Sequence, residues 1–416
     1  MLRRSAALFV ALVLGSAAVA GCSSAAAPER AAPAPSGPAT SGAAASAPAT
    51  SAAATPGEAV SGDATSPQAP GGAPAPTGTP APDAPASVAV SGTVTDGLAS
   101  PWGLAVLPDG DLLISERDEA RILRVSAADG GRTEAGTVPG VTAGGEGGLL
   151  GLALSPGFAT DHRVYAYLST ASDNRIVRLD YDPARPAGSQ LGEPAVVLSG
   201  IPHGSRHNGG RIGFGPDGFL YAGTGDADER RLSQDRGSLG GKILRLTPDG
   251  APAPGNPFPG SPVWSLGHRN VQGLAWDPQG RLWASEFGQD TWDELNLITP
   301  GGNYGWPTVE GTAGRQGFTD PVAQWHTSDA SPSGIAHAAG GVWMAALRGE
   351  RLWWIPLDGE RSAAPPRDFL SGTYGRLRTV VADRDGTLLL VTDNTDGRGD
   401  PRPGDDRILR LTVGRT

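Results

Sequence analysis

Cysteine is almost absent from this chain of 416 residues, because Cys22 is the only one. A single thiol cannot form a disulfide within the chain, so packing and hydrogen bonds must stabilise the fold. Long apolar runs are also absent after Ala20, and no later segment could span a bilayer as a helix. Acidic residues outnumber basic ones and give a formal net charge of −10. This charge argues against a nucleic-acid partner, which would require a basic surface.

The one cysteine ends a segment that is typical of exported proteins. Arg3 and Arg4 precede an apolar run over 6–20, and the small residues before Cys22 resemble a bacterial lipoprotein cleavage box. In such a box the cysteine is lipidated and becomes the mature N-terminus. We therefore predict that residues 1–22 are a lipoprotein-type signal peptide, and that the protein is exported and lipid-anchored to the outer face of the cell membrane. An ordinary signal peptide with an incidental cysteine is the alternative.

Aromatic and branched aliphatic residues are scarce in residues 23–86, which consist almost wholly of Ala, Pro, Ser, Thr and Gly. This composition buries too little apolar surface to offset the entropy lost on ordering. We predict a disordered linker, which would hold the following domain away from the membrane. Contact with the membrane would then occur only through the N-terminal lipid.

The rest of the chain, 87–416, contains short apolar runs separated by Gly, Pro, Asp and Asn turns, which is typical of β-structure. One apolar strand recurs at intervals of 52 to 67 residues. Its copies begin at Arg121, Arg175, Lys242, Glu294, Arg351 and Arg407. A second unit, made of a strand, a turn and another strand, lies upstream of each copy, as in "LAVLPDGDLLIS" and "IGFGPDGFLYAGTG".

Two interleaved series of six members indicate an all-β, six-bladed β-propeller over 87–416, because a repeat of this length matches one blade. Each blade alone leaves both sheet faces exposed, and radial stacking buries them against the neighbouring blades. We expect the strand near Val88–Val94 to close the ring by pairing with the last blade. A pair of β-sandwiches would not produce this recurrence.

Polar residues stand directly before the first strands of three blades. His207, Arg269 and Arg376 occupy the same phase of the repeat, so a closed ring would bring them to one mouth. His207 also precedes the pair Gly209-Gly210, which would allow a ligand to approach the backbone. Taken alone, such a histidine is commonly a structural hydrogen-bonding group, and alternating arginines such as Arg376 and Arg378 commonly form a solvated face.

Convergence of these groups favours a particular chemistry. Several arginines without a matching number of carboxylates would bind a multiply anionic ligand. The turn at Gly288-Gln289, beside Asp293, offers oxygen ligands for a hard cation such as calcium. A neutral histidine can act as a general base, since the ordinary pKa of imidazole lies near neutrality. Together these features suggest an organic cofactor that carries out redox work.

Several stretches resemble the soluble quinoprotein glucose/sorbosone (aldose) dehydrogenases, which are six-bladed propellers that use pyrroloquinoline quinone (PQQ) and calcium. The resemblance covers about residues 90–413 and is most specific from Leu266 to Trp306. The stretches that carry it are "GGEGGLLGLALSPGF", "RHNGGRIGFGPDGFLYAGTGD", "GGKILRLTPDG", "LGHRNVQGLAWDPQGRLWASEFGQDTWDELNLITPGGNYGWP" and "GRLRTVV".

The resemblance implies that His207 takes the proton from the anomeric hydroxyl of a sugar while Arg269 helps to polarise the quinone. It also implies a set of cofactor-binding residues, namely Glu146, His207, Arg269, Asn270, Arg348, Arg376 and Arg378. The carbonyls of Gly288 and Gln289 would hold the calcium that binds PQQ. A second calcium would involve Glu294 and the carbonyl of Tyr304. The product would be a lactone, with the electrons passed to an external acceptor.

Three positions depart from the family pattern. Glu146 replaces a glutamine, Arg348 replaces a lysine that binds PQQ, and Arg206 replaces an aspartate found in members that oxidise glucose. These departures leave a second hypothesis open, in which the chain is a non-catalytic propeller of the same family that binds a glycan or a protein.

Overall fold

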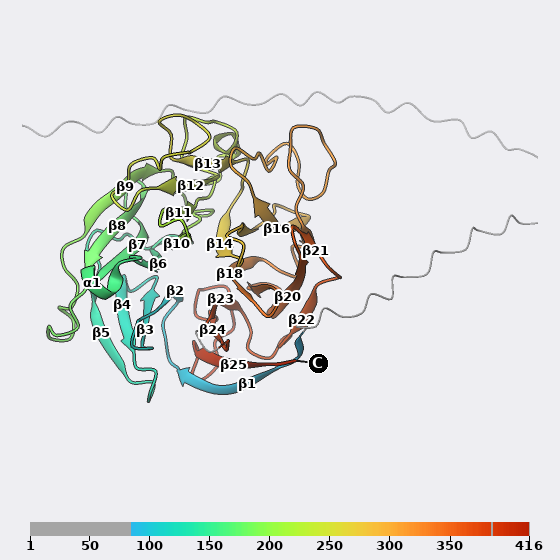
Figure 1. The fold of residues 1–416 in the computed structure, drawn as a ribbon. Coiled ribbons are helices and arrows are strands. Elements are labelled where there is room, and N and C mark those ends of the chain that lie inside the picture. Colours follow the sequence, from blue (N-terminus) through green and yellow to red (C-terminus); the bar gives the residue numbers. More distant parts are fainter. Residues whose placement is uncertain (1–84, 384–385, 416) are drawn as a thin grey trace, which may run out of the picture. The chain divides into compact units, whose positions relative to one another are not determined.

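The computed structural model describes residues 85–383 and 386–415. The predicted signal peptide and nearly all of the predicted linker lie outside these residues. The described residues form six antiparallel sheets, and Figure 1 shows them arranged as blades around a common centre. The prediction of an all-β, six-bladed propeller is therefore confirmed.

Blades are numbered here in chain order, and each is built from four strands or, in blade 5, from five. Blade 1 comprises β2 (Pro101–Val106), β3 (Leu112–Glu116), β4 (Arg121–Val125) and β5 (Arg132–Thr137). Blade 2 comprises β6 (Leu149–Leu154), β7 (Arg163–Ser169), β8 (Asn174–Asp180) and β9 (Ala195–Ile201). Blade 3 comprises β10 (Ile212–Phe214), β11 (Leu220–Gly223), β12 (Lys242–Leu246) and β13 (Val263–Leu266).

The second half of the ring continues the same pattern. Blade 4 comprises β14 (Val271–Trp276), β15 (Leu282–Glu286), β16 (Trp292–Ile298) and β17 (Ala323–His326). Blade 5 comprises β18 (Pro332–Ala338), β19 (Gly341–Ala346), β20 (Arg351–Asp358), β21 (Arg361–Ser362) and β22 (Arg367–Phe369). Blade 6 comprises β23 (Leu377–Ala382), β24 (Leu388–Thr392), β25 (Ile408–Arg415) and β1 (Pro85–Thr95).

The repeated strand found in the sequence is the third strand of every blade. Arg121, Lys242 and Arg351 are the first residues of β4, β12 and β20, and the other three copies begin within two residues of β8, β16 and β25. The second repeated unit supplies the first and second strands of each blade. Each repeat in the sequence therefore corresponds to one blade.

The ring is closed by its two ends. β1 pairs with β25 in antiparallel register, with Val88 opposite Val413 and Val90 opposite Leu411. Figure 1 shows β1 lying along the outside of blade 6, next to the last strand of the chain. The expected closure through Val88–Val94 is confirmed by this pairing.

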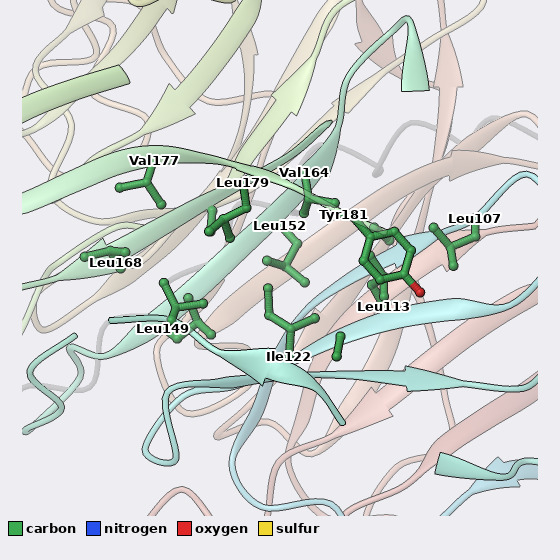
Figure 2. Packing of buried hydrophobic residues seen from close by; sticks show 14 of the residues in the cluster. Leu107, Leu113, Ile122, Leu149, Leu152, Val164, Leu168, Val177, Leu179 and Tyr181 are labelled. Atoms are coloured by element: carbon green, nitrogen blue, oxygen red, sulfur yellow. The ribbon is translucent and has the colours of Figure 1, made fainter. Parts of the chain in front are cut away.

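Six clusters of buried apolar side chains fill the spaces between neighbouring blades. The cluster between blades 1 and 2 is drawn in Figure 2, where Leu113 and Ile122 from one blade face Leu149, Leu152 and Val164 from the next. Because each sheet packs on both faces, its inner strands are buried along nearly their whole length. Packing between blades is thus what holds the first strands, and the loops before them, in place.

Helical structure within the described residues is confined to two short turns, α1 (Phe158–Asp161) and the 3-10 turn η1 (Arg230–Ser233). Neither of them, nor any other helix in the described part of the chain, has the length and hydropathy needed to cross a membrane.

Candidate active site

A cavity of about 310 Å³ opens among the loops that join neighbouring blades. Five arginines and two carboxylates line it, together with Trp102, Phe287 and smaller polar groups. The charged lining residues are Arg117, Arg348, Arg376, Arg378, Arg398, Glu146 and Asp396. Positive charge is therefore in excess around a concave site of the size that binds small molecules.

His207 lies beside this cavity in a left-handed backbone conformation, with φ of 56°. A non-glycine residue adopts this conformation at a cost of about 1–3 kcal/mol, so surrounding contacts must hold it. The backbone N–H of His207 donates to Oε2 of Glu146 at 2.8 Å, and the carbonyl of His207 accepts a hydrogen bond from the N–H of Ala227. Gly225 permits this close approach, since a Cβ there would lie 1.8 Å from the His207 carbonyl oxygen.

The imidazole of His207 is 6% exposed and has a different partner at each nitrogen. Nδ1 lies 2.7 Å from Oδ1 of Asp226, and Nε2 lies 2.8 Å from Nη2 of Arg269. A guanidinium can only donate, so Nε2 must accept, and the ring proton then belongs on Nδ1, where it is donated to Asp226. This arrangement leaves a basic lone pair on Nε2.

Asp226 is fully buried and is held by three donors, namely His207, Trp306 and the backbone N–H of Asp228. Its second oxygen, Oδ2, accepts a hydrogen bond from Nε1 of Trp306 at 2.8 Å. Burial opposes ionisation of this carboxyl, but the hydrogen bonds from His207 and Trp306 outweigh that effect and lower its pKa. Asp226 is therefore an ionised carboxylate that fixes the tautomer and the orientation of His207.

Arg269 is positioned by the loop that follows β15. Its backbone N–H donates to Glu286, its Nε approaches Oε1 of Gln289 at 3.3 Å, and its guanidinium lies 5.6 Å from the ring centre of Trp306. Burial lowers the pKa of Arg269 from its ordinary value, against the attraction of nearby carboxylates. Two of the three residues expected to meet at one mouth, His207 and Arg269, are therefore in direct contact through a hydrogen bond. The third, Arg376, lines the large cavity and touches neither of them.

Arg376 and Arg378 also face the cavity, but each is paired with a carboxylate. Arg376 binds Asp396 through Nη2 at 2.6 Å, and Arg378 binds Asp393 through Nε at 2.6 Å. The expectation that the arginines lack matching carboxylates was thus wrong for this pair, because the turn after β24 supplies two aspartates. Asp393 is only partly satisfied, since its Oδ1 is buried without a hydrogen-bond partner among the described residues.

Glu146 and Arg398 form an ion pair at the rim, with Oε1 and Nη1 2.7 Å apart. The negative charge of Glu146, which stands where the family has a glutamine, is therefore balanced by Arg398 in the loop between β24 and β25. Arg348, the second departure, is exposed at the rim and has no ion pair among the described residues. Arg206, the third, is exposed and pairs with Asp228 at 3.2 Å.

Asn270 is buried behind the histidine turn rather than along either polar cavity. Its Oδ1 accepts a hydrogen bond from the backbone N–H of Gly209 at 2.9 Å. Gly209 itself packs against the protein, because a Cβ there would lie 2.5 Å from the carbonyl oxygen of Gly223. Gly209 thus allows close packing against the end of β11, whereas the sequence suggested that the glycine pair would allow a ligand to approach. Direct contact of Asn270 with a cofactor stays a prediction.

A second, much smaller cavity of about 10 Å³ is lined in part by Arg269. Its lining includes Gly288, Glu294 and Tyr304 together with Glu286 and Glu310. A volume of this size holds one water molecule or one monatomic ion. Burial and the nearby Glu286 raise the pKa of Glu294 to about 8.

The donor set around this small cavity suits a hard cation only if backbone oxygens take part. The described residues contain no group of three or more His, Cys, Asp or Glu side chains placed to hold one metal ion. The carbonyl oxygens of Gly288, Gln289 and Tyr304, however, accept no hydrogen bond from the described residues. Gln289 does not line the cavity, although its backbone belongs to the same turn.

Two groups of predicted residues emerge from this geometry. Glu146, Arg348, Arg376 and Arg378 line the large cavity, whereas Arg269, Gly288, Glu294 and Tyr304 line the small one. Phe287 borders both cavities, and its carbonyl accepts a hydrogen bond from Arg269 at 3.4 Å. His207 joins the two groups through its contacts with Glu146 and Arg269.

A family model, described as "Glucose / Sorbosone dehydrogenase", matches residues 98–409. The chain belongs to this family. The resemblance seen in the sequence is confirmed, and with it the prediction that the chain is a dehydrogenase of this class.

Several members of the glucose/sorbosone dehydrogenase family can be compared directly. The solved PQQ-bound aldose sugar dehydrogenase of Streptomyces coelicolor is 68% identical, with a TM-score of 0.79 over 79% of this chain and 100% of that one. The aldose sugar dehydrogenase YliI of Escherichia coli is 30% identical over 76% of this chain and 92% of its own length. The quinoprotein glucose dehydrogenase B of Acinetobacter calcoaceticus is 32% identical over 59% of each chain.

Sequence reasoning missed Asp226, Trp306, Asp393, Asp396 and Arg398 as parts of this family site. A signal for two of them was present. Asp226 and Asp393 come shortly after the second strand of their blades, and in "LLISE" and "LWASE" an acid is the last residue of that strand. Alignment of the repeats would have shown an acid recurring at this phase.

Proposed function

We propose that this protein is a PQQ- and calcium-dependent dehydrogenase that oxidises an aldose at its anomeric hydroxyl to a lactone and passes the electrons to an external acceptor. The contact chain Asp226–His207–Arg269 carries this proposal, because a family member that only bound a glycan or a protein would not need an oriented base. The PQQ-bound relative from Streptomyces coelicolor supports the choice of cofactor.

The residues of the large cavity fit PQQ. Its carboxylates suit a site lined by five arginines, of which Arg348 has no ion pair among the described residues. Arg376 and Arg378 would hold the carboxylates, and Trp102 and Phe287 would supply apolar surface for a flat ring system. When bound, PQQ supplies an acceptor for the two electrons that leave the sugar.

His207 is the group that removes the proton in this proposal. Nε2 accepts the proton of the anomeric hydroxyl, so the hydroxyl must first replace Arg269 as the partner of Nε2. Asp226 stabilises the imidazolium that results, because its buried carboxylate already accepts the Nδ1 proton. Arg269 remains beside the reacting groups and offers positive charge where negative charge develops.

Calcium fits the turn at Gly288-Gln289 and the small cavity next to it. Backbone carbonyls and carboxylates are the oxygen ligands that calcium prefers. Glu294 and the carbonyl of Tyr304, two residues that line the small cavity, would bind the second ion. A cation here would supply the positive charge that the buried carboxyl of Glu294 lacks.

Calorimetric titration of the purified protein with PQQ tests the cofactor, with calcium or a chelator in the cell. We expect submicromolar binding that requires calcium, followed by dye reduction when aldoses are added. Absence of PQQ binding would remove the dehydrogenase proposal and favour the binding propeller. In the loaded protein, His207→Gln should abolish turnover and still bind PQQ, and an unchanged rate would refute the role of His207.

We also propose that the protein is exported and held at the outer face of the cell membrane by a lipid on Cys22. Only the sequence pattern before Cys22 supports this placement. Cys22→Ser should release the dehydrogenase from the membrane fraction of the producing cells, as measured by immunoblotting. A variant that stays with the membrane would contradict the lipid anchor.

A further inference from the structure

Arg211 occupies the centre of the propeller. It follows the histidine turn directly, precedes β10 and is 8% exposed. Nε donates to the carbonyl of Gln272 in β14 at 2.8 Å, and Nη2 donates to the hydroxyl of Thr379 in β23 at 2.9 Å. The guanidinium also stacks on Trp102 of β2, 4.2 Å from the ring centre. One side chain of blade 3 therefore touches the first strands of blades 4, 6 and 1.

All of these partners are neutral. No carboxylate of the described residues lies within ion-pair distance of Arg211, whereas Arg376 and Arg378 have Asp396 and Asp393. Burial, with a smaller effect of the nearby Arg378, lowers the pKa of Arg211 to about 9. The guanidinium therefore remains charged at neutral pH, and its charge is not compensated.

This charge lies directly behind the wall of the large cavity. Trp102 and Gln272, which Arg211 contacts, both line the cavity, and so does the neighbouring Arg378. Arg211 itself is not part of the lining. A ligand in the cavity would thus face the guanidinium across Trp102 and Gln272.

We propose that Arg211 is an electrostatic binding residue, which attracts a multiply anionic planar ligand across the cavity floor without touching it. The inference rests on the proposed PQQ site and extends it to a residue outside the contact set. Charge interactions through a buried, poorly hydrated region are stronger than those at the surface and are weakly screened by salt. Arg211 should therefore add affinity that persists at high ionic strength.

The test compares Arg211→Lys with Arg211→Gln, because both replacements lose the planar stacking group and only lysine keeps the charge. PQQ affinity is measured by calorimetry at low and at high salt, with calcium present. We expect Arg211→Gln to weaken binding by tenfold or more at both salt concentrations, and Arg211→Lys to stay within about threefold of the unmodified protein. Equal loss in the two variants would overturn the inference, since it would indicate a purely structural role.

Two further variants complete the design. Arg348→Gln removes an exposed rim charge, so its effect on affinity should largely disappear at high salt. Thr379→Val removes the hydroxyl that accepts from Arg211 and donates to the carbonyl of Trp102, and it leaves the charge of Arg211 in place. Affinity should therefore change by less than about threefold. If Arg211→Gln does not fold, a large loss in Thr379→Val still contradicts the inference. Failure of the unmodified protein to bind PQQ would instead remove the proposed function itself.

Discussion

The hydrogen bonds at the two nitrogens of His207 orient its ring so that Nε2 can accept a proton. Asp226 fixes the proton on Nδ1, and the desolvated carboxylate cannot easily find another partner. Nε2 is left facing Arg269, a group that has no lone pair to offer. The base is therefore oriented before any substrate arrives.

Asp226→Asn tests this arrangement at the level of one atom. The amide can donate to Nδ1, which favours the opposite tautomer and places the ring proton on Nε2. We expect kcat for aldose oxidation to fall by roughly 10²–10⁴, with a much smaller change in KM, as a wrong tautomer requires. Steady-state kinetics of the loaded protein measures both constants. A loss confined to KM would show that Asp226 acts on binding instead.

Asp393 makes a prediction about pH dependence. Burial raises its pKa to about 7, against the attraction of Arg378 and Arg117 and with added repulsion from Asp396 and Asp406. The folded protein then holds a proton between about pH 4 and 7 that the unfolded chain has released, so this group lowers stability as pH rises through that window. Asp393→Asn should remove this slope, as measured by urea unfolding of the cofactor-free protein across pH 4 to 8.

Asp396→Asn is the matched control for that experiment. Burial opposes ionisation of Asp396 too, but Arg376 and Arg378 hold its pKa below the ordinary value. Its contribution to stability is therefore present at neutral pH and is lost as pH falls through the folded pKa. The two asparagine variants should change the pH profile in opposite directions, and parallel profiles would contradict the assignment of Asp393.

At the level of elements, one device recurs from blade to blade. An acid at or just after the end of the second strand holds the segment before the first strand of its own blade. Glu116 accepts from the N–H of Ala99, and Glu286 accepts from that of Arg269. Asp226 and Asp393 bind side chains instead: the imidazole of His207, before β10, and the guanidinium of Arg378, within β23. The polar residues at the mouth are thus fixed by a repeated feature of the blade.

This device explains what the sequence could and could not predict. Strand order and blade number follow from apolar periodicity, and the positions of His207, Arg269 and Arg376 follow from repeat phase. Pairing between separate loops does not, because an aspartate after a strand is also an ordinary turn residue. The contact between Glu146 and Arg398 joins two loops about 250 residues apart, and neither loop has a periodic pattern that reveals it.

Lys242 stabilises another element near the site. Its ammonium donates to the carbonyls of Leu232, Ser233 and Gly240 at 2.6, 3.1 and 2.7 Å, which ties η1 and the following turn to β12. Gln234, the next residue after η1, binds the carbonyl of Trp306 and so connects this turn with the partner of Asp226.

Lys242→Met should therefore destabilise the propeller by about 3 kcal/mol, because buried carbonyls lose their donors. Urea unfolding measures the change in the free energy of unfolding. Arg231→Met, in the same turn but with a side chain that is 80% exposed, should change it by less than about 1 kcal/mol. Similar effects of the two substitutions would show that the buried ammonium is not the stabilising group.

At the level of the whole propeller, stability depends on closure. β1 supplies the outer strand of blade 6, and Val88 and Val90 pack against the cluster between blades 5 and 6. An open ring would expose β25 as an unpaired edge, which invites further opening or association between chains.

Substituting both Val88 and Val90 by Asp should lower the free energy of unfolding by roughly 3 kcal/mol, because apolar burial is lost and two charges are placed against the core. Thermal unfolding and amide hydrogen exchange in β25 would both report the change. Val196→Asp is the control, since this outer-strand residue of blade 2 is 56% exposed. Unchanged exchange in β25 would mean that the ring does not need β1.

The burial of Lys242 affects how readily the protein itself would react with reducing sugars. Open-chain aldoses react with free amines to form glycation products, and the ε-amino group of lysine is their usual target. Lys242 is the only lysine in the sequence and is fully buried, while arginine provides almost all of the positive charge elsewhere. If the proposed aldose oxidation is right, the sugar would thus meet no exposed lysine amine on the protein.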